Sequence, residues 1–275
     1  MKRILHLMVS TAVRFDRNDG WAHSSHIALS MLLALFPFCI FALSLAGQLH
    51  ADISTQELAD FVLGAWPDDL AEPIEREILA VLEASDTTKI TFGAVLAVFF
   101  ASNGIDAIRK AVSGAYYETD TRPMWYTRLI CILFVLFAAF VLSLGGLLTV
   151  ALPASFSFVE ESAPELYSAL FSSEILRGTI AVMFLTLLVT ASHIWLPQTH
   201  RPLRRVFPGV FVTLVLWGIC GWGFSIYIRD ISTYSATYAG LSGIMATIVF
   251  LYFMAAVFIL GAEFNAQNAE TESSI

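Results

Sequence analysis

Charge is scarce in this 275-residue sequence. Charged side chains make up 14% of it, whereas about 25% is usual for a soluble domain. Hydrophobic residues make up 57%, and the mean hydropathy is +0.72. A deficit of charge over a whole chain excludes an ordinary soluble domain and indicates that lipid is the main solvent.

The apolar residues fall into six runs of about 20 residues, long enough to cross the hydrocarbon core of a bilayer as helices. They lack the alternation of a transmembrane barrel strand. Because only helices and closed barrels satisfy their backbone groups in lipid, the sequence predicts an all-α, polytopic membrane protein with one six-span domain over residues 1–275. The predicted spans are His26–Gln48, Ile90–Arg109, Leu129–Leu152, Leu176–Leu196, Val206–Ile228 and Gly240–Ala262.

Cysteine is scarce too, and Cys39, Cys131 and Cys220 each lie in a different apolar run. Their spacing fits neither a disulfide framework nor a zinc site. The sequence lacks a nucleophile elbow, a Walker A loop and a zinc-protease motif, and its six histidines are scattered. We therefore predict no metal, no cofactor and no enzymatic activity.

Net positive charge is absent, because 15 Lys and Arg stand against 23 Asp and Glu, which gives a formal charge of −8. RNA binding needs a basic surface, usually lined by aromatic side chains. The balance of charge therefore disfavours a nucleic acid partner and a ribonuclease activity.

Two segments outside the spans have amphipathic patterns. Residues 1–25 begin with Lys2 and Arg3 before an apolar stretch, but no small-residue cleavage site of a signal peptide follows. We expect an uncleaved amphipathic helix on the cytoplasmic membrane surface. The acidic outer loop, residues 49–89, contains a possible capping box at Ser54 and Glu57 and apolar residues at helical spacing, which predict short helices.

Lys and Arg are concentrated in alternate loops, with eleven of the fifteen on one side. By the positive-inside rule, both termini face the cytoplasm. The basic inner face suits anionic lipid headgroups, or it is only the topology signal. The eleven cations are Lys2, Arg3, Arg14, Arg17, Arg109, Lys110, Arg122, Arg128, Arg201, Arg204 and Arg205.

Polar residues at helical spacing interrupt the second run. Asp106 lies three residues before Arg109 and four before Lys110, so all three can pair on one helix face. Asn103 lies one turn deeper and needs a partner from another helix or from water. Two interpretations stay open: a charged helix end that anchors the span, or a polar patch that lines a cytoplasm-facing cavity.

Other spans supply neighbours for this patch. Glu263 and Asn265 follow the sixth run at the cytoplasmic edge, where pairing with Arg109 or Lys110 would neutralise Glu263. Pro37 predicts a kink in the first span. In the fifth span, Gly218, Gly221 and Ser225 form a smooth surface that predicts close helix packing.

Three blocks make the sequence resemble the YihY/BrkB family of bacterial inner-membrane proteins. They are "HSSHIALSMLLALFPF", "SNGIDAIRKAVSGAYYETDTRPMWYTR" and "PGVFVTLVLWGICGWGFSIYIRDISTYSATYAGLSGIMATIVFLYFMAAVFILGAEFNAQ". The resemblance implies a six-span protein of the bacterial inner membrane. Family members have been labelled virulence or serum-resistance factors and, in older usage, ribonuclease BN. The recurring polar positions of the family correspond to Asn103, Arg109, Glu263 and Asn265, and no catalytic residue carries over.

These observations favour a transporter or translocator of a lipid-like or amphiphilic substrate, with membrane lipids as partners. The predicted polar cavity between helices is lined by Asn103, Asp106, Arg109, Lys110, Glu263 and Asn265. The alternative is a non-transporting membrane scaffold or envelope-integrity factor, which would have a dry, tightly packed bundle interior.

Overall fold

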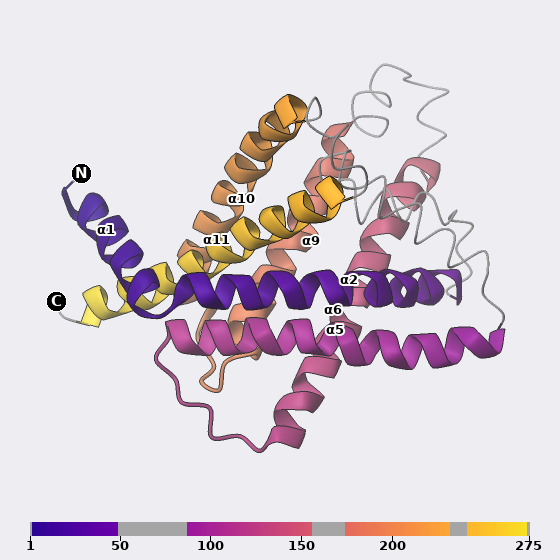
Figure 1. Cartoon of the computed structure of the whole chain (residues 1–275), viewed down its shortest axis with the longest axis horizontal. Helices are drawn as coiled ribbons and strands as arrows, with labels where there is room; N and C mark the ends of the chain where they lie inside the picture. The colour runs from indigo at the N-terminus through magenta and orange to yellow at the C-terminus, as the bar shows by residue number, and fades with distance from the viewer. Residues whose placement is uncertain (1, 49–86, 156–173, 232–240, 274–275) are drawn as a thin grey trace.

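The computed structural model describes residues 2–48, 87–155, 174–231 and 241–273. Within these ranges the chain forms seven α-helices (Figure 1), which confirms the all-α prediction. The helices are α1 (Lys2–Arg17), α2 (Gly20–Gln48), α5 (Thr87–Ala115), α6 (Met124–Ser155), α9 (Glu174–Trp195), α10 (Leu203–Ile231) and α11 (Leu241–Ser273).

Each predicted span coincides with one long helix to within a residue, or lies inside it. Among the described residues, four segments are long and apolar enough to cross a membrane, so the chain is a multi-pass membrane protein. The count of six spans and the cytoplasmic position of the termini remain predictions. The four segments are Met124–Leu148, Gly178–Trp195, Leu203–Tyr227 and Met245–Glu270.

The helices pack around a core at the end of the molecule where the two termini lie (Figure 1). Helices α2 and α5 run side by side in opposite directions, and α11 contacts both α2 and α10. Helix α11 continues eleven residues past Ala262, the predicted end of the sixth span. This polar extension stays helical because it packs against α1.

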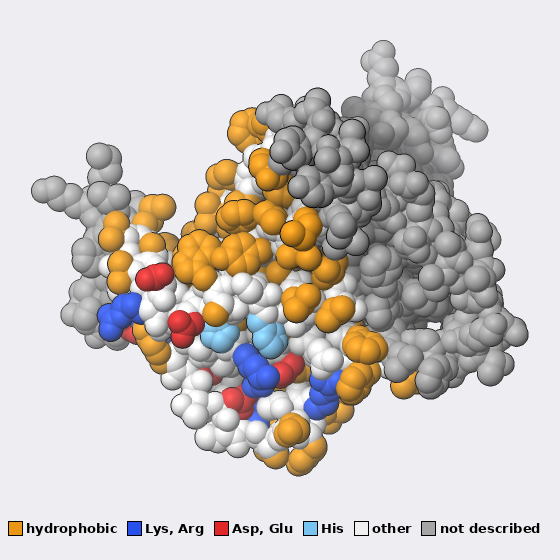
Figure 2. Space-filling view, viewed as in Figure 1, with side chains coloured by type: hydrophobic (Ala, Val, Ile, Leu, Met, Phe, Trp, Pro, Cys, Tyr) orange, Lys and Arg blue, Asp and Glu red, His pale blue; other side chains and the backbone are white. Residues whose placement is uncertain are grey.

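Helix α10 has an exposed apolar face. Phe207, Phe211, Val215, Ile219 and Trp222 recur at helical spacing and are all exposed. Exposed apolar surface of this extent mediates contact with a membrane or a partner. Figure 2 shows the same separation, with apolar side chains over α10 and α11 and charged side chains gathered where α1, α2 and α5 lie.

The N-terminal helix is present as α1, but its apolar residues divide between two faces. Phe15 is buried in the core, whereas Met8, Val9 and Val13 are exposed. Contact between α1 and the membrane surface remains a prediction. The helices expected in the acidic loop lie outside the described residues. Helix α2 runs through Pro37, and the kink predicted there remains a prediction.

Close packing of α10 against α11 occurs at Gly209 and Gly261, which lie outside the segment from Gly218 to Ser225 where the sequence predicted it. A Cβ on Gly209 would lie 2.5 Å from a side-chain atom of α11 and would collide with the carbonyl oxygen of Gly261. A Cβ on Gly218 or Gly221 would meet no atom within 4 Å in the described part of the chain. Small residues permit a close contact but do not require one, so packing through Gly218, Gly221 and Ser225 stays a prediction.

Candidate functional site

A buried ion-pair cluster joins α1 to α11. The Arg14 Nε lies 3.1 Å from Oε2 of Glu263, and the Asn18 amide donates to Oε1 of Glu263 at 2.6 Å. Glu263 is fully buried, and Arg14 also binds Glu270 at 2.7 Å. Burial opposes the charge of Arg14, but hydrogen bonds to Glu270 and Glu263 raise its pKa above the ordinary value. We call this group, with Gln267, the α1–α11 cluster.

The pairing of Glu263 with Arg109 or Lys110 was therefore predicted wrongly. Its partners are four residues apart: Arg14 lies on α1, which packs on α11, and Asn18 lies in the turn that follows α1. Their spacing was visible in the sequence. What the sequence did not reveal is that α1 folds back over the last helix.

The pairing expected within α5 is confirmed. Asp106 binds Arg109 and Lys110, with both N–O distances 2.8 Å. Arg109 is 7% exposed and also pairs with Asp120 in the connection to α6. Lys110 is exposed. These residues form a charged helix end, as the first of the two sequence interpretations expects.

Asp120 extends this group into the loops. It binds Arg122 at 2.7 Å, and Arg122 donates to the carbonyl oxygen of Leu196 at 2.8 Å. Hydrogen bonds from Arg122 lower the pKa of Asp120 to about 2. The group of Asp106, Arg109, Lys110, Asp120 and Arg122, which we call the loop cluster, therefore ties α5 to the end of α9.

Asn265 fixes the crossing of α11 with α10. Its Oδ1 accepts from the backbone N–H of Gly209 at 2.6 Å, and its Nδ2 donates to the carbonyl oxygen of Val206 at 2.8 Å. The side chain is 2% exposed. Gly209 allows this approach because it has no side chain. Asn265 thus joins two helices through the α10 backbone.

Asn103 is separate from these groups. It is exposed, and its Oδ1 accepts from Arg128 of α6 at 2.6 Å. The sequence analysis expected Asn103 to need a partner from another helix or from water, and that partner is Arg128. The structure places Asn103 on the surface of the α5–α6 pair and does not join it to Glu263 or Asn265.

A third buried polar group was missed by the sequence analysis. The hydroxyl of Tyr116 lies 3.3 Å from Nδ1 of His193, and the guanidinium of Arg201 lies 3.8 Å from the centre of the Tyr116 ring. Arg201 is bound to Glu118 at 3.0 Å. Among the described side chains, Nε2 of His193, Nε of Arg201 and Oγ of Ser113 are buried without a partner. No spacing in the sequence links Tyr116 to His193 or Arg201, since they come from separate elements.

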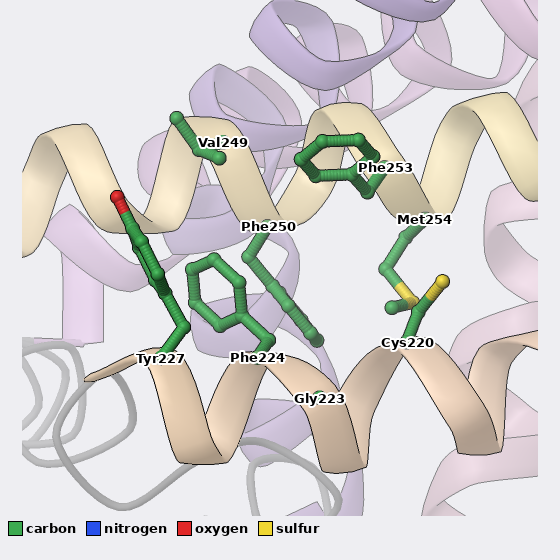
Figure 3. Close-up of a pocket in the computed structure, with 8 residues that line it drawn as sticks. All are labelled: Cys220, Gly223, Phe224, Tyr227, Val249, Phe250, Phe253 and Met254. Carbon is green, nitrogen blue, oxygen red and sulfur yellow. The ribbon is translucent and has the colours of Figure 1, made fainter. Parts of the chain in front are cut away.

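An apolar groove of about 400 Å³ lies between α10 and α11, away from the charged end. Figure 3 shows its aromatic side chains, with Phe224 and Tyr227 on α10 facing Phe250 on α11. It carries no charged lining residue. In the described ranges no group of three or more His, Cys, Asp or Glu side chains is placed to hold a metal ion.

The helices and the buried charges define an all-α, multi-pass membrane protein whose polar contacts gather at one end. The sequence model of the family described as Virulence factor BrkB matches residues 11–274, so the chain belongs to the BrkB family. No solved structure matches it.

Three relatives cover most of the chain. "Putative ribonuclease-like protein YfkH" of Bacillus subtilis (strain 168) is 27% identical, over 92% of this chain and 91% of its own. A UPF0761 membrane protein of Aeromonas salmonicida (strain A449) is 26% identical, over 95% and 88%. Another, of Cronobacter sakazakii (strain ATCC BAA-894), is 26% identical, over 91% and 84%.

Proposed function

We propose that this BrkB-family protein translocates an amphiphile with an anionic headgroup across the bilayer, and that the α1–α11 cluster closes the cytoplasmic end of its path. The observation that carries the proposal is Glu263. It is fully buried inside a candidate membrane span, and its charged partner, Arg14, lies on a helix outside the candidate spans. Ionisable residues inside membrane helices are functional candidates by default, and substrate or ion pathways are among the roles they mark.

The energetics of the pair support a switching role. Burying two charges costs several kcal/mol per ion, and apolar replacements of similar volume are often as stable. A permanent contact between α1 and α11 would therefore not need charge. A contact that opens and closes benefits from it, because the separated ions regain hydration or bind another charged group.

The connectivity of α1 allows such opening. A short turn at Asn18 and Asp19 joins α1 to α2, and Asp19 has a left-handed backbone with φ of 53°. Helix α1 can therefore move without displacing a membrane span. Its departure would expose Glu263 and free Arg14 to bind a headgroup, while the acyl chains remain in lipid.

The scaffold alternative is favoured by a different observation. Each residue predicted to line the cavity has a partner within the protein, so none of them needs a substrate to satisfy its polar groups. Nothing in the sequence resembles an ATPase motif, so a translocator would draw energy from a gradient or from a partner.

The deciding experiment is translocation of a fluorescent phosphatidylglycerol in liposomes containing the purified full-length protein. We expect wild type to exceed empty liposomes and Glu263→Gln to translocate more slowly than wild type, because a neutral amide cannot re-form the charged closure on which each cycle depends. Asp16→Asn is the matched control and should keep the wild-type rate, since Asp16 is an exposed carboxylate of α1 outside the cluster.

Each outcome of this experiment is decisive. Wild-type liposomes that translocate no faster than empty ones would favour the scaffold. Translocation that survives Glu263→Gln unchanged would remove the α1–α11 cluster from the path. Circular dichroism and gel filtration confirm that each variant remains folded.

A further inference from the structure

Arg128 is held in a fixed position on the surface of the α5–α6 pair. One guanidinium nitrogen donates to Oδ1 of Asn103 at 2.6 Å, and the other donates to the carbonyl oxygen of Phe99 at 3.0 Å. The guanidinium carbon lies 4.5 Å from the centre of the Phe99 ring. An arginine that snorkels from a helix end keeps its charged head in water. Arg128 instead lies against α5 in one defined orientation.

The partners of Arg128 are all neutral, which sets it apart from the other basic side chains whose partners are described. Five of those have a carboxylate oxygen within 3.1 Å, namely Arg14, Arg109, Lys110, Arg122 and Arg201. Arg128 has no carboxylate partner in the described ranges. The carboxylate one turn further along α5, Asp106, is already bound by Arg109 and Lys110. The charge of Arg128 is therefore not neutralised within the described chain.

The surface around Arg128 is suited to lipid. Phe99 is 53% exposed, and Trp125 and Tyr126, which precede Arg128 on α6, are 71% and 42% exposed. Trp and Tyr are enriched where membrane helices meet the headgroups. Phe100 and Leu129 add exposed apolar surface beside them. Exposed aromatic and apolar side chains therefore surround the cation, as is expected of a group at the boundary between headgroups and acyl chains.

We propose that Arg128, positioned by Asn103 and Phe99, binds the phosphate of an anionic membrane phospholipid at the lipid-facing surface of α5 and α6. A guanidinium has five N–H donors, and the contacts to Asn103 and Phe99 leave donors free for phosphate oxygens. The planar fork of arginine matches phosphate well. The exposed aromatic side chains contact the upper part of the acyl chains.

This site lies outside the helix bundle and does not depend on translocation. It differs from the proposed path in its residues and in its partner, since Glu263 belongs to the buried α1–α11 cluster. Failure of the translocation experiment would leave the Arg128 site intact, and the reverse also holds.

The test is thermal unfolding of the purified full-length protein in a neutral detergent, with phosphatidylglycerol, phosphatidylcholine or inorganic phosphate added. We expect phosphatidylglycerol to raise the Tm of wild type clearly more than phosphatidylcholine does, and inorganic phosphate to have no effect. In Arg128→Gln the shift caused by phosphatidylglycerol should fall by at least half. Arg205→Gln, which removes an exposed cation from the start of α10, should keep it.

Two further variants separate the contributions of charge and geometry. Arg128→Lys keeps the charge but lacks the fork, and Asn103→Leu keeps the arginine but removes one of its two hydrogen bonds. Both should retain an intermediate shift. The proposal is overturned if Arg128→Gln keeps the full shift, or if inorganic phosphate or phosphatidylcholine stabilises wild type as much as phosphatidylglycerol does. Native mass spectrometry of retained lipid gives the same comparison for any variant of low stability.

Discussion

Arg14 on α1 and Arg128 on α6 are both bound by another helix, but the surroundings of the two guanidinium groups differ. The Arg14 side chain is 11% exposed and faces Glu263 and Glu270. Arg128 faces an amide and a carbonyl oxygen on a surface of exposed aromatic rings. A buried cation needs its counter-charge within the chain, whereas a cation at the bilayer surface can take one from lipid.

The largest expected difference between the two regions is in stability. Arg14→Leu leaves Glu263 buried without a cation, which should lower the free energy of unfolding by about 3–5 kcal/mol. Arg128→Leu leaves only neutral groups behind on an exposed surface and should cost about 1 kcal/mol. Thermal or denaturant unfolding in detergent compares the two variants directly.

A double variant sharpens this prediction. Arg14→Met combined with Glu263→Met should recover most of the loss, because two apolar side chains can replace a buried pair without leaving a charge. Equal losses for Arg14→Leu and Arg128→Leu would contradict the distinction between the two sites.

The sequence predicted those contacts that join residues close together in the chain, and it missed those that join residues far apart. The long helices were predictable because each apolar run must satisfy its own backbone in lipid. The Asp106–Arg109–Lys110 contacts were predictable because helix geometry sets the spacing of neighbours three and four residues apart. Both predictions depend only on local geometry.

Contacts between helices were not predictable from the same rules. Glu263 is 249 residues from Arg14, and Asn103 is 25 residues from Arg128. The choice of partner depends on how the helices cross, which periodicity does not determine. For the same reason, the glycines of α10 did not indicate which of them contacts α11.

A second prediction concerns Asp120, which binds Arg109 and Arg122. We expect its effect on stability to lie between those of the buried Arg14 and the exposed Arg128. Its pKa is lowered from 3.8 to about 2. A lowered pKa in the folded state means that ionised Asp120 contributes stability above about pH 4, and that this contribution is lost as the pH falls toward 2. Wild type should therefore lose more Tm between pH 5 and pH 2 than Asp120→Asn does, on the order of a few degrees. If the Tm of the two proteins falls equally with pH, the arginines do not stabilise the ionised form of Asp120.

The smallest expected effects come from the aromatic rings beneath the two arginines. Arg14 lies 4.6 Å from the centre of the Tyr117 ring, much as Arg128 lies over Phe99. Replacing either ring by Leu should cost about 0.5–1 kcal/mol of unfolding free energy.

Tyr117 also has φ of 53°, a left-handed conformation that costs about 1–2 kcal/mol for a residue with a side chain. Tyr117→Gly should therefore be more stable than Tyr117→Leu, because glycine relieves that strain while both variants lose the ring. If Tyr117→Gly is instead the less stable of the two in thermal unfolding, the backbone at this position is not strained and the ring contact alone determines the effect.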